Sequence, residues 1–236
     1  MNLYTDPKFI EGFPVTISPA GNIENETEER ITNDIINSAP GPSFVFAELG
    51  AGYGRWSAHV ALYVKEHRPD LRTHIIAVEP EPTHFQWLVE HMANNGVTDM
   101  TLIDRPITAS EKWVLFQVGS PATWYGQGVV SLRKLFRVGR PTRIARSITL
   151  EEIFSGIPTI DMINMDIQGE ELAVLSAASR QLLRKIRWLY IGTHSADIER
   201  GLKELLPLHG FHLTYELPQN VPFGVTDGIQ VWRREE

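Results

Sequence analysis

Five ionisable residues close the short apolar runs of this chain. They are Glu48, Glu79, Asp104, Asp166 and His194. If the runs are parallel strands, their carboxyl ends meet at one edge of a sheet, where open α/β sheets bind their ligands. Four carboxylates on one edge repel one another and lose hydration, so a purely structural sheet gains nothing from them. We therefore expect a ligand rich in hydrogen-bond donors and positive charge at this edge.

The first of these runs leads into a glycine-rich turn, E-L-G-A-G-Y-G, over residues 48–54. Its glycines at 50, 52 and 54 allow a tight turn and a close approach of the backbone to a ligand. A dinucleotide-binding turn requires G-x-G-x-x-G, and Arg55 occupies the position of its third glycine. The turn instead resembles the nucleotide-binding turn of class I S-adenosylmethionine methyltransferases. A bare structural turn is the alternative.

Two further acids suit a nucleoside. A carboxylate at Glu79 can accept hydrogen bonds from both hydroxyls of a ribose, a feature that NAD-binding proteins share. Asp104 occupies a position from which its side chain can accept a hydrogen bond from an adenine amino group. The alternatives are an exposed loop acid at Glu79 and a solvated turn acid at Asp104.

The elements that position these residues alternate between strand and helix patterns. Buried strands are predicted over 44–50, 74–80, 100–107, 161–169 and 186–194, with an added strand over 113–118. Helices are predicted over 31–38, 55–66 and 198–206, from the capping box at 149–152, and over a segment that ends near residue 178. Another is marked by the helical spacing of Phe85, Leu88, Val89 and Met92. The segments 211–217 and 228–234 should form an antiparallel hairpin, so the alternation predicts a mostly parallel α/β sheet with helices on both faces.

Composition narrows the class of protein. The chain has no cysteine, which excludes a disulfide scaffold, a Cys-ligated metal site and a thiol nucleophile. Its net charge of −7 disfavours general nucleic-acid binding, which needs clustered Lys and Arg. No apolar run reaches the length of a membrane span, and the first residues lack the apolar region of a secretion signal. We therefore expect a cytoplasmic protein.

Most of the chain, from about residue 44 to residue 232, resembles the FkbM family of methyltransferases. AVEPEPTHFQWLVEHMANNG (77–96) is similar to the family's second motif, and TLIDRPITASEKWVLFQV (101–118) is similar to its third block. The most specific signature, roughly T-L-D-D-L and then L-L-K-I-D-V-E-G-A-E-x-x-V-L, resembles residues 147–154 and 160–178. Asp166, Gly169, Glu171 and Leu175 keep that pattern.

The chain departs from the family pattern at four positions. Asn164 replaces a Lys, Gln168 replaces a Glu and Asp104 replaces an Asn. Gly192 occupies the position, two residues before His194, at which the family has an acidic residue. These departures leave the expected fold intact and bear on the substrate and the catalytic group.

The resemblance implies a Rossmann-like class I methyltransferase fold with a seven-stranded sheet. We expect this domain over 41–236, after an N-terminal lid or extension over 1–40. It implies S-adenosylmethionine as the cofactor and, as the acceptor, a hydroxyl oxygen of a sugar, polysaccharide or natural product. The residues expected to bind the cofactor are Glu48, Gly50, Ala51, Gly52, Glu79, Pro80, Asp104 and Asp166.

The expected catalytic residues are Asp166 and His194. Methyl transfer to a hydroxyl needs alignment and removal of the hydroxyl proton. Glu48 and Asp166 are expected to hold the cofactor's ammonium, and Asp166 can also orient the acceptor. His194, with an ordinary pKa of about 6.5, is either the general base or a structural residue that binds a loop. Asp197 is expected to cap the next helix. A divalent metal bound by Asp166, His194 and Asp197 is an alternative that we do not expect.

The segment 108–148 is expected to be an insertion that covers a small-molecule or glycan acceptor. Trp124 and Tyr125 within it either stack on a sugar face or hold the loop in place. From Arg133 to Arg146 there are six basic residues and no acid, which form a solvated face or attract an anionic acceptor. The first 40 residues either close over the cofactor or are disordered.

Two other functions stay open at this point. Asn164 and Gln168 suggest a non-catalytic descendant that keeps the fold as a binding or assembly module. Arg55 disfavours an NAD-dependent oxidoreductase.

Overall fold

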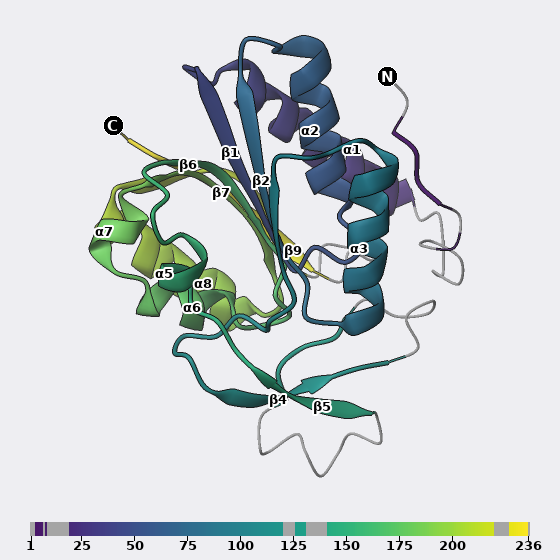
Figure 1. Cartoon of the computed structure of the whole chain (residues 1–236). Helices are drawn as coiled ribbons and strands as arrows, with labels where there is room; N and C mark the ends of the chain where they lie inside the picture. The colour runs from purple at the N-terminus through teal and green to yellow at the C-terminus, as the bar shows by residue number, and fades with distance from the viewer. Residues whose placement is uncertain are drawn as a thin grey trace.

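The protein is described by a computed structural model of residues 3–6, 8, 19–119, 126–130, 141–219 and 227–235. Its centre is a seven-stranded sheet in the order β3-β2-β1-β6-β7-β9-β8 (Figure 1). The strands are β1 (Ser43–Leu49), β2 (Arg72–Val78), β3 (Met100–Ile103), β6 (Ile160–Met165), β7 (Ile186–Thr193), β8 (Phe211–Leu217) and β9 (Gly228–Arg234). Each of them begins close to the start of a predicted strand.

The first five of these strands in the order of the sheet are parallel. β1 pairs with β2 and β6, and these pair in turn with β3 and β7. β9 runs antiparallel between β7 and β8. The predicted mostly parallel sheet with a C-terminal antiparallel hairpin is therefore confirmed. The strand order reverses between β1 and β6, and such a switch point is where open α/β sheets bind ligands.

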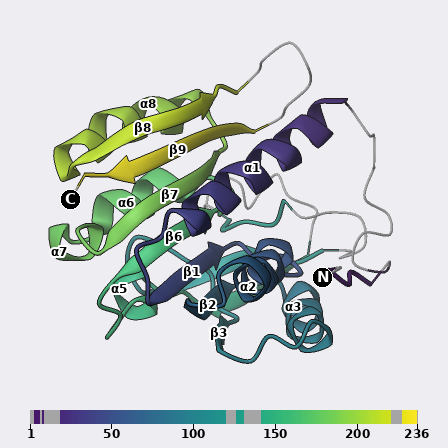
Figure 2. The same ribbon diagram turned by 90° about the horizontal axis from the view of Figure 1, so that it is seen from above.

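Helices cover both faces of the sheet (Figure 2). One face carries α1 (Pro19–Asn37), α2 (Arg55–His67) and α3 (Pro82–Asn94), and the other carries α5 (Leu150–Ile153), α6 (Glu171–Ala177), α7 (Arg180–Leu183) and α8 (Ala196–Leu205). Each face has its own apolar core because side chains alternate along a strand: in β1, Phe44 and Phe46 face α2, while Ala47 and Leu49 face the opposite helices. None of the described helices is both long and apolar enough to cross a membrane.

The insertion contributes a separate two-stranded sheet of β4 (Trp113–Gln117) and β5 (Thr142–Arg146), drawn below the main sheet in Figure 1. The predicted strand at 113–118 is confirmed, but its partner β5 was not predicted. Only Ala145 of β5 is buried, so the sequence TRIAR has no alternating apolar pattern to reveal a strand.

Two helical predictions need correction, and one short helix was not predicted. The first helix begins at Pro19, well before the expected residue 31, because its polar first half has no apolar periodicity. In α3 the expected apolar face is wrong at Val89, which is 41% exposed, whereas His84 and His91 are buried. The four-residue helix α7 was not predicted, since one turn is too short to show a period.

Replacement of Gly50 by Ala should destabilise the fold more than the same change at Gly96. Both residues have a positive φ, 88° and 67°, so each change costs about 1–2 kcal/mol of backbone strain. At Gly50 an added Cβ would also lie 1.8 Å from the carbonyl oxygen of Asp166, whereas nothing lies within 4 Å at Gly96. Gly50→Ala therefore has to separate β1 from β6, for a total loss of about 3 kcal/mol or more. Urea denaturation measures both losses, and equal values would contradict this close packing.

Candidate active site

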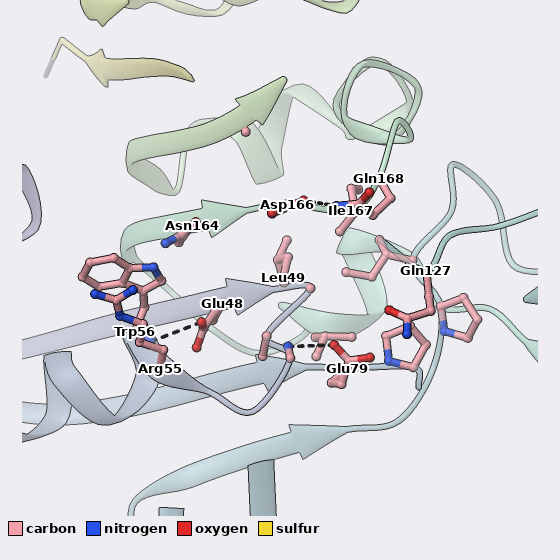
Figure 3. A pocket seen from close by; sticks show the side chains of 18 of the residues that line it. Glu48, Leu49, Arg55, Trp56, Glu79, Gln127, Asn164, Asp166, Ile167 and Gln168 are labelled. Atoms are coloured by element: carbon pink, nitrogen blue, oxygen red, sulfur yellow. Dashed lines mark hydrogen bonds between the residues drawn. The ribbon is translucent and has the colours of Figure 1, made fainter. Parts of the chain in front are cut away.

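A cavity opens at the carboxyl ends of the parallel strands, at the switch point between β1 and β6 (Figure 3). Its wall is formed by the turn after β1, the ends of β2, β6 and β7, the start of α2 and parts of the insertion. We call it the strand-edge cavity. Every residue expected to bind the cofactor, apart from Asp104, lines it. The fold thus brings together Glu48, Gly50, Ala51, Gly52, Glu79, Pro80 and Asp166.

Glu79 is buried directly after β2 and joins the end of this strand to the glycine-rich turn. Its Oε2 accepts the N–H of Gly52 at 2.7 Å, and its Oε1 accepts the N–H of Glu81 at 2.7 Å. Burial raises the pKa of Glu79 to about 8, although both hydrogen bonds oppose the rise. A carboxylate has about four lone-pair sites, so two remain for donors of a ligand in the cavity.

The carboxylate of Glu48 accepts hydrogen bonds at the N-terminus of α2. It accepts the N–H of Trp56 at 3.3 Å and that of Ser57 at 2.8 Å, and it also accepts the Ser57 hydroxyl. The residue before this helix, Gly54, has no side chain to accept these bonds, so Glu48 stabilises the helix N-terminus in its place. Burial raises the pKa of Glu48 to about 7. Its expected contact with an ammonium stays a prediction.

Asp166 and His194 lie against each other, as the strand ends predict, and Glu171 joins them. The Nε2 of His194 lies 3.2 Å from Oδ1 of Asp166, and its Nδ1 lies 2.9 Å from Oε1 of Glu171. Burial lowers the pKa of His194, but the two carboxylates more than offset this and raise it to about 10. At neutral pH both ring nitrogens of His194 are therefore protonated and the imidazole is positively charged. A role for His194 as general base, which stays a prediction, requires that one of these two protons leave first.

Two predicted residues lie elsewhere. Asp104 is exposed and does not line the cavity, although Pro106 and Ile107 after it do. Asp197 is wrong as a helix cap: the hydroxyl of Ser195 accepts the N–H of Ile198 at 3.2 Å and begins α8. The side chain of Asp197 is exposed and pairs with Arg200 at 2.6 Å.

The insertion reaches the cavity through Phe116, Gln127 and Val129. Two of the six basic residues from Arg133 to Arg146 are described, and both make internal contacts. Arg143 donates from Nη2 to the carbonyl oxygens of Pro80 at 2.6 Å and Asp104 at 3.1 Å. Arg146 pairs with Glu111 at 2.6 Å. The expected sugar-stacking residues Trp124 and Tyr125, and the basic residues at 133, 134, 137 and 140, lie outside the described residues.

The N-terminal helix also contributes to the wall. Glu28 of α1 is buried, and its Oε1 accepts a hydrogen bond from Nδ2 of Asn164 at 2.6 Å. Both side chains line the cavity. Sequence reasoning missed this contact because Glu28 belongs to an acidic stretch that looks solvated. Asn164 does carry a signal, since it departs from the family pattern at this position.

Comparisons with known proteins agree with this geometry. The model of the "Methyltransferase FkbM domain" family matches residues 48–216. A protein of Jannaschia sp. (strain CCS1), named "Putative methyltransferase", is 25% identical over 238 residues, which cover 94% of this chain and 82% of that protein. These matches favour a methyltransferase over the NAD-dependent alternative.

Solved structures show the same fold at low identity. Methyltransferase FkbM from Methylobacillus flagellatus KT aligns with a TM-score of 0.50 and 16% identity over 81% of this chain, and this chain covers 44% of that protein. The METTL16 MTase domain aligns at 0.52 with 14% identity, over 89% and 67% of the two chains. The ribosomal protein L11 methylase from Lactobacillus delbrueckii subsp. bulgaricus aligns at 0.50 with 11% identity, over 91% and 81%. The expected class I methyltransferase fold is therefore confirmed.

The folded protein should lose stability between pH 7 and pH 8, in part through Glu79. The carboxyl ionises at its ordinary value of 4.5 in the unfolded chain and at about 8 in the folded protein. Between these values only the folded form holds the proton, so the free energy of unfolding falls as pH rises and levels off above the folded pKa.

Glu79→Gln cannot ionise, so its thermal unfolding curve should be flatter than that of the wild type across this window. Glu90→Gln, on the surface of α3, is the matched control and should keep the wild-type slope. A wild-type slope in Glu79→Gln would contradict the raised pKa.

Proposed function

This chain belongs to the FkbM methyltransferase family, and from this premise we propose that it transfers the methyl group of S-adenosylmethionine to a hydroxyl oxygen. The acceptor class is a sugar, a polysaccharide or a natural product. One observation carries the proposal: a buried carboxyl group, Glu79, and the glycine-rich turn that donates to it face the same cavity as Asp166, which lies against His194. A nucleoside site and an acid–base pair thus adjoin each other.

The residues of the cavity fit the cofactor that the family implies. Glu79 has acceptor capacity left for two ribose hydroxyls. The backbone of Gly50 and Gly52 lines the cavity without side chains, which leaves room for a close approach. The carboxylates of Glu48 and Asp166 suit the positive charges of the amino and sulfonium groups. When bound, the cofactor supplies a methyl group on a sulfur that departs neutral.

Asp166 is the member of the acid–base pair that lines the cavity, so it is the group that contacts the acceptor. Its Oδ1 already accepts a hydrogen bond from Nε2 of Gln168 at 2.7 Å, which fixes the carboxylate. The other oxygen is free to accept the acceptor hydroxyl and aim its lone pair for in-line attack. His194 lies behind Asp166 and acts through it in this arrangement.

The acceptor is proposed to be small or glycan-like rather than nucleic acid. The net charge of −7 opposes general phosphate-backbone binding. An anionic acceptor stays compatible with the basic stretch of the insertion.

Calorimetry should detect S-adenosylmethionine binding to the wild type and a loss of at least about tenfold in Glu79→Ala, because two hydrogen bonds to the Glu79 carboxyl group are removed. Glu90→Ala should bind as the wild type does. Circular dichroism checks that Glu79→Ala is folded, and Glu79→Gln, which keeps one acceptor oxygen, should fall between the two. Wild-type affinity in both Glu79 variants would refute the nucleoside site.

Transfer of a labelled methyl group should yield an alkali-stable ether on a sugar hydroxyl when glycosides, nucleotide-linked sugars and an RNA oligomer are offered in parallel. Asp166→Asn should lower kcat by about 100-fold or more, with a smaller change in cofactor affinity. Label in the RNA would contradict the acceptor class. Cofactor binding without transfer to any acceptor would instead favour the non-catalytic alternative.

A further inference from the structure

Three side chains from separate segments converge beside the strand-edge cavity. Asp166 follows β6, Glu171 begins α6 and His194 follows β7. One nitrogen or oxygen atom from each lies within 4.8 Å of those from the other two. We call this group the edge triad. It forms because the two strands are parallel neighbours, so that both open onto the same rim.

The triad contains buried polar atoms with unused bonding capacity. Glu171 is fully buried, and its Oε1 accepts the N–H groups of Ile167 and Gly169, both at 3.1 Å. Its Oε2 is buried without a hydrogen-bond partner. Each ring nitrogen of His194 lies close to a different carboxylate, but neither nitrogen has the geometry of a hydrogen bond. Such atoms are costly in a folded protein unless a ligand completes them.

A third carboxyl group lies in the electrostatic neighbourhood of the triad. Asp227, before β9, lines the cavity and interacts electrostatically with Asp166, Glu171 and His194. Two carboxylates therefore contact one imidazole, and the carboxyl group of Asp227 acts on it electrostatically. An excess of carboxylates at this edge attracts a cation, although only Glu171 of the triad is fully buried and Asp166 is exposed.

We propose that the edge triad binds one divalent metal ion through an oxygen of Asp166, an oxygen of Glu171 and one ring nitrogen of His194. Carboxylate oxygens with an imidazole suit Mn²⁺ and Mg²⁺, and the cysteine-free chain offers no thiolate for softer ions. Ligand atoms at about 2.1 Å from one ion lie about 3–4 Å apart, so the triad closes by a small movement of its side chains. The second ring nitrogen keeps its N–H for a carboxylate, as metal-binding histidines commonly do.

The triad differs from the metal set that the sequence suggests. Asp197 is turned to Arg200 on the surface, and Glu171 takes its place. The consequence for the reaction rests on the proposed function. An ion at Asp166 would hold the acceptor hydroxyl at the cavity rim and lower its pKa, and it would leave His194 without its second proton.

Manganese binding to the chelator-treated protein tests the site without cofactor or acceptor. Electron paramagnetic resonance should detect one bound Mn²⁺ for each chain, and Asp166→Asn and His194→Gln should each weaken binding by at least about tenfold. Asp197→Asn is the matched control and should bind as the wild type does. Mn²⁺ should also raise the unfolding temperature of the wild type but not of Asp166→Asn.

The proposal is overturned if no Mn²⁺ binds at about 1 mM, or if both triad variants bind it as well as the wild type does. It is also overturned if Asp197→Asn abolishes binding. Calorimetry with S-adenosylmethionine is run on the same metal-free samples. Cofactor binding without Mn²⁺ binding rejects the metal site and leaves the proposed function intact, whereas the opposite result rejects the proposed function alone.

Discussion

The contact between β1 and β6 at the switch point is the constraint on which the rest of the site depends. The N–H of Asp166 donates to the carbonyl oxygen of Leu49 at 2.8 Å, and Gly50 fits against the carbonyl of Asp166 because it has no Cβ. This contact holds the glycine-rich turn and the end of β6 on one rim. The glycine-rich turn and Asp166, on two sides of the cavity, are therefore positioned by a single strand pair.

Buried carboxylates give this rim its chemical character. Glu48 and Glu79 both lose hydration, and backbone N–H groups of α2 and of the turns compensate only part of that loss. The pKa of each consequently rises toward neutrality. A cationic ligand rich in hydroxyl groups, such as the proposed cofactor, would replace the hydration that these two carboxyl groups lose on burial.

The sequence predicts the elements whose side chains follow a clear period and the residues that end them. The pattern of strand ends alone is enough to place Glu79 and Asp166 on the cavity wall, because parallel strands must share an edge. What the sequence does not predict depends on packing between distant segments. In the sequence, Glu171 indicates only a helix residue, because its contact with His194 depends on the turn that precedes it. β5 has too few buried side chains to show the pattern of a strand. Asp104 ends its strand as expected, yet its position alone does not direct it into the cavity.

The hydrogen bond from Asn164 to Glu28 spans 136 residues, and it closes one wall of the cavity. A wall built from α1 and β6 requires that the two ends of the long chain segment between them come together. This closure costs conformational entropy and slows folding. During synthesis, the glycine-rich turn emerges from the ribosome long before β6. The wall that Glu28 and Asn164 form is therefore completed only after β6 has been synthesised, so the cavity takes its final form late in synthesis.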